Sequence, residues 1–581
     1  MSTVGIDLGT TNSEIAWLDG GEPQVLAIGG SALVPSVVSL AGDGRILVGA
    51  TALNNELLAP GDTVRWIKRR MGTDQVVQFA GKSWTPAMIS SLILRHLKEA
   101  AEAHLGRPVT RAVVTVPAFF SERAREDTRE AARLAGLEVL RLVNEPTAAA
   151  AAYARGNRRD EHWLVYDLGG GTFDVSVIAT AGEIMEVRAS HGDTQLGGHD
   201  FDRQLATRAA EDFRARHGID LAVDPRAWAR LIRAAEAAKI RLSRDATATI
   251  REEHIANAKG ADLHLEYEIR RTEYEAMIAP AIERTIASVR NALAQAGLDA
   301  RAITRVLMVG GVCRTPLVQN RLREALGLEP QAWINPDTVV AQGAAIEAAA
   351  MAGEHIAAAM VDITPHSLGV GALGADAQLR NCILIRRNSP LPCSASEVFY
   401  KQFPDQERLE IDVFQGESPS PERNHRVGSF TLDGLGSSET REVHCRFDID
   451  RSGLLQVAVT DLASGVNITR TIERPRPVQR TGMADLGSVR IVDALELGEG
   501  DAEAGDWEAL RPDPGPSQVD EDEASGEGGD DAALAQQVED LLARSDLDQS
   551  DRDELAARLT SARAGDAAAQ ARLRDLVYFL Q

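Results

Sequence analysis

Two glycine-rich turns contain the residue types in this sequence that are best suited to chemistry. One follows the apolar run that ends at Asp167 and consists of three glycines, Thr172 and a second apolar run. Glycines let backbone N–H groups approach an anion closely, and an aspartate can hold a cation that bridges to that anion. The pattern predicts a strand–turn–strand unit that binds phosphate and a metal ion. Taken alone, the turn also fits an ordinary hairpin whose glycines serve only the turn geometry.

The second turn lies near the N-terminus and repeats the first. Val4–Ser13 consists of an apolar run, Asp7, a glycine and hydroxyl residues. Asp7 precedes Asp167 by 160 positions (167 − 7). Two matching turns at this separation indicate a duplicated domain with a ligand clamped between its halves.

Three further polar features have both a functional and a structural interpretation. The basic segment 63–72 contains Lys68 and by itself is typical of a solvated surface. Glu145 lies at a predicted helix start, where an acidic residue usually serves the helix dipole. Glu236, Lys239 and Ser243 share a helix face at spacings of three and seven residues, as a surface salt-bridge face would.

Other kinds of nucleotide or metal site do not fit. Gly81-Lys82-Ser83 would need glycine at position 76 to form a Walker A loop, but that residue is Val76. No GxGxxG fingerprint follows the first strand. Four cysteines without CxxC or zinc-ligand spacing suit a reduced cytoplasm.

The composition is that of a soluble, multidomain protein. With 44% hydrophobic and 25% charged residues, the composition is typical of a globular protein. A chain of 581 residues is too long to fold around a single hydrophobic core. A net charge of −24 argues against nucleic-acid binding, which depends on Lys and Arg. No apolar run is long enough to span a bilayer, and the N-terminus does not resemble a signal peptide.

Periodicity and capping residues predict the main elements. Helices are expected over 86–105, from Ser121 to Gly136, through most of 200–245, and over 272–297 and 341–352, with short strands over 33–50 and a strand over 139–143. Residues 363–473 alternate in short runs typical of an antiparallel β domain. Residues 474–531 have the composition of a disordered linker, and 532–581 show helical spacing.

The ordered set of motifs resembles the actin/hexokinase-type ATPase fold and, more narrowly, the heat shock protein 70 family of DnaK-like chaperones. The matching stretches run in the family's order over residues 1–473. They are Gly5–Ser13, Ile67–Gly72, Val114–Phe120, Asn144–Ala152, Asp167–Val175, Gly192–Gly198, Glu236–Ser243, Gly310–Arg314, Asn335–Asp337, Thr364–Gly369, Val413–Glu417 and Phe447–Leu455.

The resemblance implies a multidomain architecture. A two-lobed α/β ATPase domain is followed by a β-sandwich that binds peptide and by a short helical C-terminal segment. The implied boundaries are 1–355 for the ATPase domain, 356–362 for the interdomain linker, 363–473 for the sandwich, 474–531 for the acidic linker and 532–581 for the helical segment.

The resemblance also implies roles for individual residues. Asp7, Glu145 and Asp167 would hold Mg²⁺ through water, and Lys68 would approach the γ-phosphate and the attacking water. Thr172 and Asp174 would orient that water and a monovalent cation, expected to be K⁺. The residues implied to bind ATP or ADP are Gly9, Thr10, Thr11, Asn12, Gly169, Gly170, Gly171, Gly197, Gly198, Glu236, Lys239, Ser243, Gly310, Gly311, Arg314 and Asp337.

For the β domain, the resemblance implies a site for extended apolar peptide. Pro117 and Arg125 would relay signals between this site and the nucleotide. The residues implied to line the peptide site are Val370, Leu373, Phe399, Leu409 and Ile411. An ordinary β-sheet core is the alternative for these apolar side chains.

Several positions depart from the family pattern. The linker Ala358–Asp362 is less aliphatic than usual, which predicts weaker docking, and Phe119 replaces a usual tyrosine. Val312 and Cys313 replace a small polar pair beside the adenine, so oxidation of Cys313 is hypothesised to weaken nucleotide binding. The segment between Gly72 and Trp84 is short for the family, so the sequence does not indicate whether the usual contacts with a nucleotide exchange factor form. The long helical lid is absent, as in short specialised bacterial members, and this predicts fast peptide release.

The sequence therefore predicts an ATP-dependent chaperone of the cytoplasm that assists protein folding, with a role in stress. Its expected partners are unfolded polypeptides and a J-domain co-chaperone, and a monomer is expected. A small-molecule kinase of the same fold would leave 363–473 unexplained, and an actin-like filament would not need that region. A nucleotide-sensing scaffold without turnover would not need Lys68.

Overall fold

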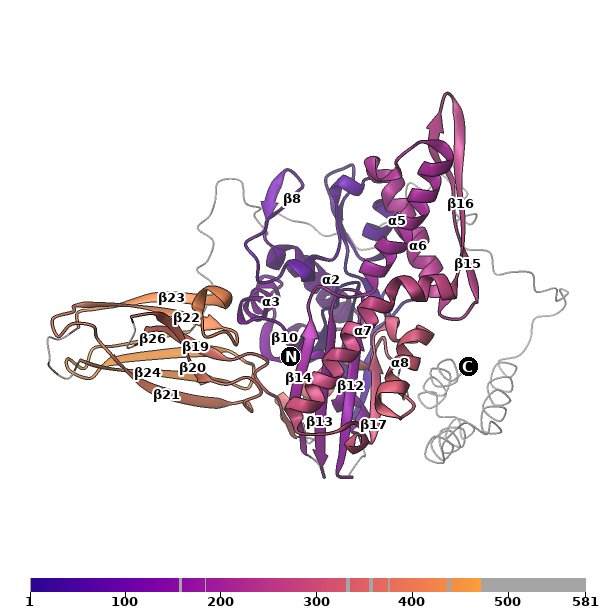
Figure 1. The fold of residues 1–581 in the computed structure, drawn as a ribbon. Coiled ribbons are helices and arrows are strands. Elements are labelled where there is room, and N and C mark those ends of the chain that lie inside the picture. Colours follow the sequence, from indigo (N-terminus) through magenta and orange to yellow (C-terminus); the bar gives the residue numbers. More distant parts are fainter. Residues whose placement is uncertain are drawn as a thin grey trace. The chain divides into compact units, whose positions relative to one another are not determined.

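The computed structural model describes residues 2–155, 159–182, 184–330, 335–354, 359–374, 377–435, 439 and 441–471. These residues form two α/β lobes and an antiparallel β-sandwich (Figure 1). The predicted linker 474–531 and the predicted helices of 532–581 lie outside the described residues. Among the residues described, no helix combines the length and the apolar character needed to cross a membrane.

The first lobe is built on a mixed sheet with the strand order β11-β10-β1-β2-β3, and β4 pairs with β2. Strand β1 runs antiparallel to β2 and parallel to β10, so the turn after β1 opens at the edge where β10 also ends. The strands are β1 (Ser2–Asp7), β2 (Asn12–Asp19), β3 (Glu22–Val25), β4 (Val34–Pro35), β10 (Val109–Val116) and β11 (Glu138–Asn144).

The second lobe repeats this arrangement in the strand order β17-β12-β13-β14-β18. Strand β12 runs antiparallel to β13 and parallel to β17, as β1 does with β2 and β10. The duplication predicted from the two matching turns is therefore present. The strands are β12 (Glu161–Leu168), β13 (Phe173–Ala181), β14 (Ile184–Asp193), β17 (Arg305–Val309) and β18 (Ala359–Val361).

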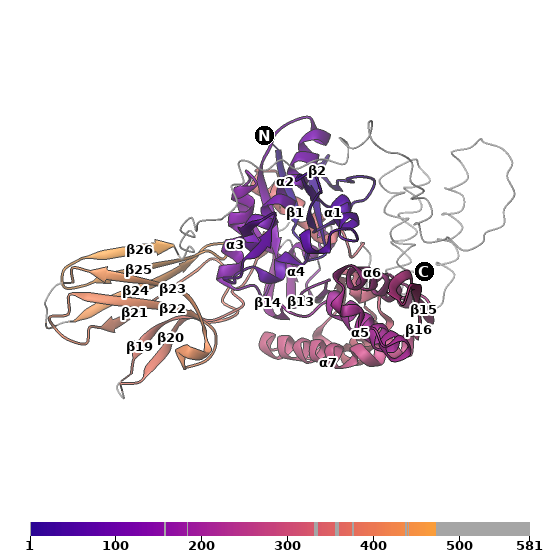
Figure 2. The ribbon, with the colours of Figure 1, turned by 90° about the horizontal axis from the view of Figure 1, so that it is seen from above.

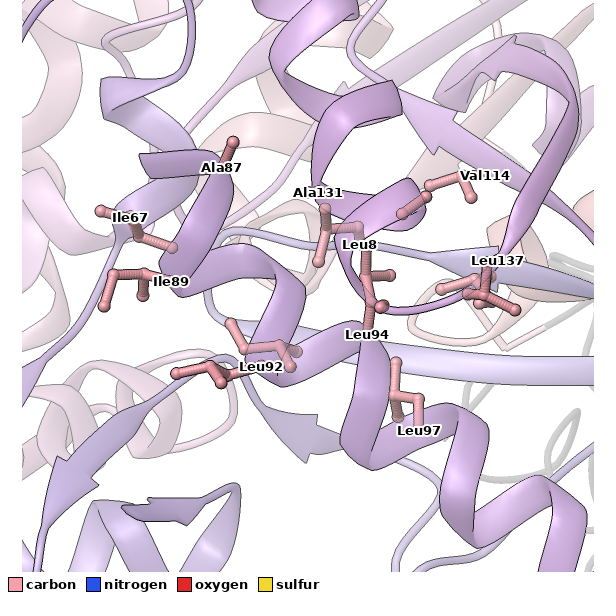
Figure 3. Packing of buried hydrophobic residues seen from close by; sticks show 14 of the residues in the cluster. Leu8, Ile67, Ala87, Ile89, Leu92, Leu94, Leu97, Val114, Ala131 and Leu137 are labelled. Carbon is pink, nitrogen blue, oxygen red and sulfur yellow. The ribbon is translucent and has the colours of Figure 1, made fainter. Parts of the chain in front are cut away.

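Helix α2 (Pro86–Leu105) organises the core of the first lobe. Thr85 caps its start by accepting a hydrogen bond from the Met88 amide, and Gly106, with φ 63°, ends it, as the sequence predicts. Figure 3 shows apolar side chains of α2 packed with residues from the sheet and from helix α3 (Glu122–Leu134). Those labelled on α2 are Ala87, Ile89, Leu92, Leu94 and Leu97, and those facing them are Leu8, Ile67, Val114, Ala131 and Leu137.

Helices α4 (Glu145–Tyr153) and α9 (Val339–Met351) pack unusually closely because their contact residues are small. A Cβ on Gly343 of α9 would lie 1.7 Å from the carbonyl oxygen of Ala148 in α4. On the sheet side, a Cβ on Gly5 of β1 would lie 2.1 Å from the amide nitrogen of Ala345 in α9. The backbone of α9 is thus held against both β1 and α4, directly behind the two turns.

Helix α7 packs against strands β13 and β14 of the second-lobe sheet, whereas α5 and α6 pack on each other and on the hairpin β15–β16. Figure 1 shows this hairpin extending past α5 and α6. Besides its sheet, the second lobe contains α5 (Gly198–His217), α6 (Pro225–Leu242), β15 (Thr247–Ala258), β16 (Ala261–Arg270), α7 (Arg271–Ala296) and α8 (Pro316–Leu326). The smaller elements of the first lobe are β5 (Val38–Leu40), β6 (Ile46–Val48), α1 (Ala50–Asn55), β7 (Thr63–Val64), β8 (Val77–Phe79) and β9 (Lys82–Trp84).

Two four-stranded antiparallel sheets form the β-sandwich, and Figure 2 shows them as two layers. Their inner faces share one core that includes Val413, Phe447 and Val457. One sheet consists of β20 (Leu379–Ile385), β19 (Leu368–Leu373), β22 (Arg408–Gln415) and β23 (His425–Asp433). The other consists of β21 (Cys393–Tyr400), β24 (Glu442–Ile449), β25 (Leu455–Asp461) and β26 (Asn467–Thr471).

The chain enters the sandwich through β18, which pairs in parallel with β14 of the second lobe. Met360 is the register partner of Met185, and Val361 that of Glu186. Just beyond β18, the Asp362 carboxylate accepts a hydrogen bond of 3.3 Å from Thr147 of α4. The backbone ladder forms without a strongly aliphatic linker, so the weaker docking predicted from its side chains stays a prediction.

Candidate functional site

The turns after β1 and β12 line a cavity of about 110 Å³ between the two lobes. Most of the residues that the sequence predicts for the site meet there, from elements up to 330 positions apart (337 − 7). They are Asp7, Gly9, Thr10, Thr11, Asn12, Lys68, Glu145, Asp167, Gly169, Gly170, Thr172, Gly310, Gly311 and Asp337.

The two turns touch each other, and glycine makes this contact possible. A Cβ on Gly170 would lie 1.9 Å from the Thr11 hydroxyl, and one on Gly171 would lie 2.3 Å from the Thr10 methyl group. A Cβ on Gly197 would lie 2.4 Å from the Gly171 amide nitrogen. Glycine therefore lets the two turns approach each other closely, and within the second turn the Gly169 amide donates to the Thr172 carbonyl at 3.1 Å.

Lys68 is the cation at the centre of the cavity. It lies in the 3₁₀ helix Ile67–Arg70, and its side chain is only 4% exposed. Its ammonium group forms an ion pair with Glu145. Burial would lower the pKa of Lys68, but the carboxylates of Glu145, Asp7 and Asp167 outweigh burial and raise it. The solvated-surface interpretation is therefore wrong for Lys68.

Glu145 is the first residue of α4, so it occupies the helix position that its sequence context predicts. Burial raises its pKa to about 6, although the charge of Lys68 opposes the shift. The ion pair with Lys68 offsets part of the cost of burying this carboxylate. Glu145 thus has a role in the site beyond helix capping, since it fixes the Lys68 ammonium group.

Asp167 and Asp174 are direct cross-strand partners on β12 and β13. Burial, together with the charge of Glu145, raises both of their pKa values. The Asp174 carboxylate accepts a hydrogen bond of 3.0 Å from the Phe119 amide of the first lobe. On the other side, the Asp7 carboxylate accepts one of 2.6 Å from Thr115 of β10.

This group of buried carboxylates has the electrostatic character of a cation site. The raised pKa values of Glu145, Asp167 and Asp174 reflect burial and mutual repulsion, and a divalent cation nearby would relieve the repulsion. Within the described part of the chain, no three or more His, Cys, Asp or Glu side chains are arranged to ligate a metal directly. Binding of Mg²⁺ through its water shell therefore stays a prediction.

The remaining predicted nucleotide residues do not line this cavity but surround it. Lys239 pairs with Asp202 at 2.7 Å and donates to the Gly198 carbonyl at 3.3 Å. Arg314 pairs with Asp337 at 2.8 Å. Glu236 lies 3.5 Å from Arg65 of the first lobe. The predicted residues outside the cavity lining are Gly171, Asp174, Gly197, Gly198, Glu236, Lys239, Ser243 and Arg314.

One buried acid that lines the cavity, Glu14, is not among the residues predicted from the sequence. It is only 3% exposed, lines the cavity and is the cross-strand partner of Asp7. Burial and the negative charge of Asp7 raise its pKa well above the usual range. The signal in the sequence is a glutamate within the apolar strand that follows the first turn.

Cys313 lies close to the site but is enclosed. Its side chain is 1% exposed, and its thiol donates to the Val309 carbonyl at 2.9 Å. Burial raises its pKa, so the reactive thiolate is disfavoured. This environment argues against ready oxidation of Cys313.

The predicted relay residues lie between the site and the sandwich. Arg125 is 5% exposed and donates to Asn144, the residue before Glu145, at 2.6 Å. Its other partner is the carbonyl of Ala118, which follows Pro117. The Glu122 amide donates to Gln415 of β22 at 3.3 Å.

The predicted peptide-site residues differ in exposure. Val370 and Ile411 are 5% and 6% exposed and belong to the sandwich core, as the alternative interpretation holds. Phe399 and Leu409 are partly buried against the same core. Leu373 is 52% exposed. Peptide binding by this set stays a prediction.

Comparison with known protein families agrees with this geometry. The family described as Hsp70 protein matches residues 3–488, which is most of the chain. Two lobes around a central cavity, followed by a β-sandwich, are the architecture of that family. This chain belongs to the Hsp70 family.

Proposed function

We propose that this protein is an ATP-driven chaperone that binds extended apolar segments of unfolded polypeptides and couples their binding to ATP hydrolysis. Hsp70 proteins are ATPases and chaperones in general. The observation that carries the finer proposal is the buried Lys68–Glu145 pair, enclosed by interlocking glycine turns from both lobes.

In this proposal, the nucleotide phosphates bind between the two turns. Backbone N–H groups near Gly9 and Gly169 would donate to the phosphate oxygens. Lys68, held by Glu145, would donate to the γ-phosphate and stabilise the charge that develops there. Thr172 and Asp174 would orient the attacking water. Phosphoryl transfer of this kind depends on positioning and electrostatics, which a rigid buried pair can supply.

Cations complete the site. Mg²⁺, when bound, would neutralise part of the phosphate charge, and Asp7, Glu145 and Asp167 would hold its water shell. K⁺ would bind near Thr172 and Asp174. The excess of buried carboxylates over the single Lys68 ammonium group supports the binding of cations.

The exposed apolar side chains of the sandwich support peptide binding. Leu373, Val398, Tyr400 and Phe403 are between 38% and 66% exposed, on two strands and one loop. Val398 and Tyr400 are two residues apart on β21 and therefore point to the same face, where an extended peptide could bury them while its backbone forms hydrogen bonds.

The interface between the first lobe and the sandwich supports coupling. Pro117 and Arg125 would relay changes at Glu145 to β22, through Asn144 and the Glu122–Gln415 hydrogen bond. A J-domain co-chaperone would act on this coupling. We propose no nucleotide exchange factor. The protein would act as a monomer in the cytoplasm, with a role in stress.

The test is ATP hydrolysis by the full chain, with and without a J-domain protein and an unfolded peptide. Stimulation by both is expected, and Lys68→Ala should lower single-turnover hydrolysis about a hundredfold or more. Lys82→Ala, at an exposed position on β9, is the matched control. Hydrolysis that ignores peptide, phosphate transfer to a sugar, or ATP binding without turnover would each overturn the proposal.

A further inference from the structure

An aromatic stack joins the two lobes beside the nucleotide cavity. The ring of Trp66 from the first lobe lies 3.6 Å from the ring of His199 in the second, measured between centroids, with 25° between the ring planes. His199 follows Gly197 and Gly198 at the start of α5, and its amide donates to the Gly170 carbonyl at 2.8 Å. The stack therefore adjoins the phosphate-binding turns.

The cavity of about 110 Å³ lies where the turns of the two lobes meet, with Thr10 and Thr11 against the opposite glycines. Separation of the lobes would widen this site. Contacts that hold the lobes together therefore oppose the exit of a nucleotide bound between them.

The segment Arg65–Arg69 makes several of these contacts. Arg69 forms two hydrogen bonds with the Asp200 carboxylate, at 3.0 and 3.1 Å. Arg65 lies 3.5 Å from Glu236, and its guanidinium lies over the Trp66 ring at 4.4 Å. Partly exposed ion pairs are weakened by solvent. The stacked rings lose less to solvent, since they exclude water from their contact face.

The same segment is fixed firmly in the first lobe. Ile67, between Trp66 and Lys68, is 2% exposed and packs in the core near Ile89 of α2 (Figure 3). Trp66 itself adopts the left-handed backbone conformation, with φ 55°. A bulky residue rarely adopts this conformation without compensating contacts, and the stack supplies such a contact.

We propose that the Trp66–His199 stack is a latch across the nucleotide cleft that limits the rate of nucleotide release. Trp66 lies two residues before Lys68, so one segment carries both the latch and the ammonium group of the site. This inference rests on the proposed function, since it assumes that the cavity binds ATP and ADP. It adds a gating role for two residues outside the predicted catalytic set.

The charges around His199 favour the neutral form of its imidazole ring, which is the form that the proposed latch requires. Burial and the positive charges of Arg69, Arg203, Arg65 and Lys239 lower its pKa to about 3. The imidazole is therefore uncharged in the closed conformation at neutral pH. An uncharged ring can stack on the indole without repulsion from the surrounding guanidinium groups.

The test is the dissociation rate of a fluorescent ADP analogue from the full chain in stopped flow. Trp66→Ala and His199→Ala should each accelerate release about tenfold. The double variant should be no faster than either single variant, because each removes the same contact. His199→Phe keeps an aromatic face and should restore slow release.

The chain offers a matched control in a second Trp–His pair. Trp17 and His104 lie 5.1 Å apart within the first lobe, away from the cleft. His104→Ala should leave release unchanged. Release within twofold of wild type in both alanine variants, with nucleotide binding intact by calorimetry, would overturn the latch. Failure of the wild-type chain to bind nucleotide would instead overturn the proposed function.

Discussion

At the scale of single residues, the cavity combines one buried cation with an excess of buried carboxyl groups. Lys68 faces Glu145, Asp7 and Asp167, and Glu14 adds a further acid that the family resemblance does not imply. Ligand-free protein therefore bears the repulsion between these groups. The repulsion makes the stability of the ATPase domain sensitive to pH.

Glu14→Gln should stabilise the ligand-free protein at pH 8. Burial raises the pKa of Glu14 in the folded state, so the folded protein binds more protons than the unfolded chain above pH 4.5. Stability then falls as the pH rises, by up to about 1.4 kcal/mol per pH unit for this group. Gln removes this dependence, and thermal unfolding from pH 5 to pH 8 measures it. Glu211→Gln, at an exposed position of α5, should change little, and an equal gain at pH 5 and pH 8 would contradict the explanation.

The four cysteines should differ sharply in reactivity. Cys313 and Cys445 are 1% and 3% exposed, whereas Cys382 and Cys393 are partly exposed. Alkylation of native protein, followed by mass spectrometry, should therefore modify Cys382 and Cys393 well before the other two. Prompt labelling of Cys313 would revive the hypothesis that its oxidation controls nucleotide binding.

At the scale of elements, α9 packs closely against both α4 and β1 behind the site. The contact depends on Gly343 and Gly5, since a Cβ at either position would overlap backbone atoms. Alanine normally favours a helix over glycine by about 1 kcal/mol. In α9 the steric effect should dominate that preference.

Gly343→Ala should destabilise the protein by about 1–3 kcal/mol, because the added methyl group meets the Ala148 carbonyl at 1.7 Å. Chemical denaturation monitored by tryptophan fluorescence measures the change. Gln342→Ala, the neighbouring position on the same helix, is the control and should be nearly neutral. A more stable Gly343→Ala protein would show that α4 and α9 can move apart at little energetic cost.

Most of these elements could be predicted from the sequence. The helix ending at Gly106, the helix capped by Ser121 and the duplicated turns follow from local patterns, and the structure contains each of them. The pairing of α9 with α4 could not be predicted, because alanine-rich helices with almost uniform apolarity do not indicate which face is buried. Glu14 was missed for another reason, since the pairing register of β1 with β2, which places it beside Asp7, is set by the exact length of the turn between them.

For the site as well, single residues could be predicted from the sequence, but contacts between distant residues could not. The sequence and the family resemblance identify Lys68, Glu145 and Asp167 as site residues, and the structure places them together. The stack of Trp66 on His199 joins residues 133 positions apart (199 − 66) and depends on a left-handed backbone that no local pattern reveals. Contacts of this kind depend on the closed arrangement of the two lobes.

At the scale of the whole molecule, two buried ionisable groups lie where the first lobe contacts the sandwich. The His366 ring packs edge-on against Phe119 at 4.4 Å and contacts the Phe119 carbonyl at 3.3 Å. Burial, with Arg125 and Arg387 nearby, lowers the pKa of His366 to about 4, although the Phe119 carbonyl and Glu417 oppose this. Burial raises the pKa of Glu122 to about 7, against the charges of Arg125 and Arg129.

These two groups should respond to acid in opposite directions. Undocking would return the pKa of His366 towards 6.5, so docking weakens as the pH falls from about 7 towards 4. It would return the pKa of Glu122 towards 4.5, so the same fall in pH strengthens docking. The two contributions offset each other in the wild-type protein.

Single substitutions should separate the two effects. In the His366→Leu variant, docking should strengthen as the pH falls from 7 to 5. In the Glu122→Gln variant, docking should weaken over the same fall in pH. Energy transfer between dyes on the ATPase domain and the sandwich measures docking at each pH. His104→Leu, outside this contact, is the control. Identical pH profiles for the two variants would contradict this explanation.

The interlocked turns have a further consequence for regulation. In the proposed function each lobe supplies part of the groups that react with ATP, so the hydrolysis rate would be the chemical rate multiplied by the fraction of time that the lobes are closed. A partner bound anywhere on the outer surface would change turnover by the factor by which it changes this fraction. Control of turnover would then require no access to the cavity, so surfaces remote from Lys68 would be as open to evolutionary tuning as the residues of the cavity.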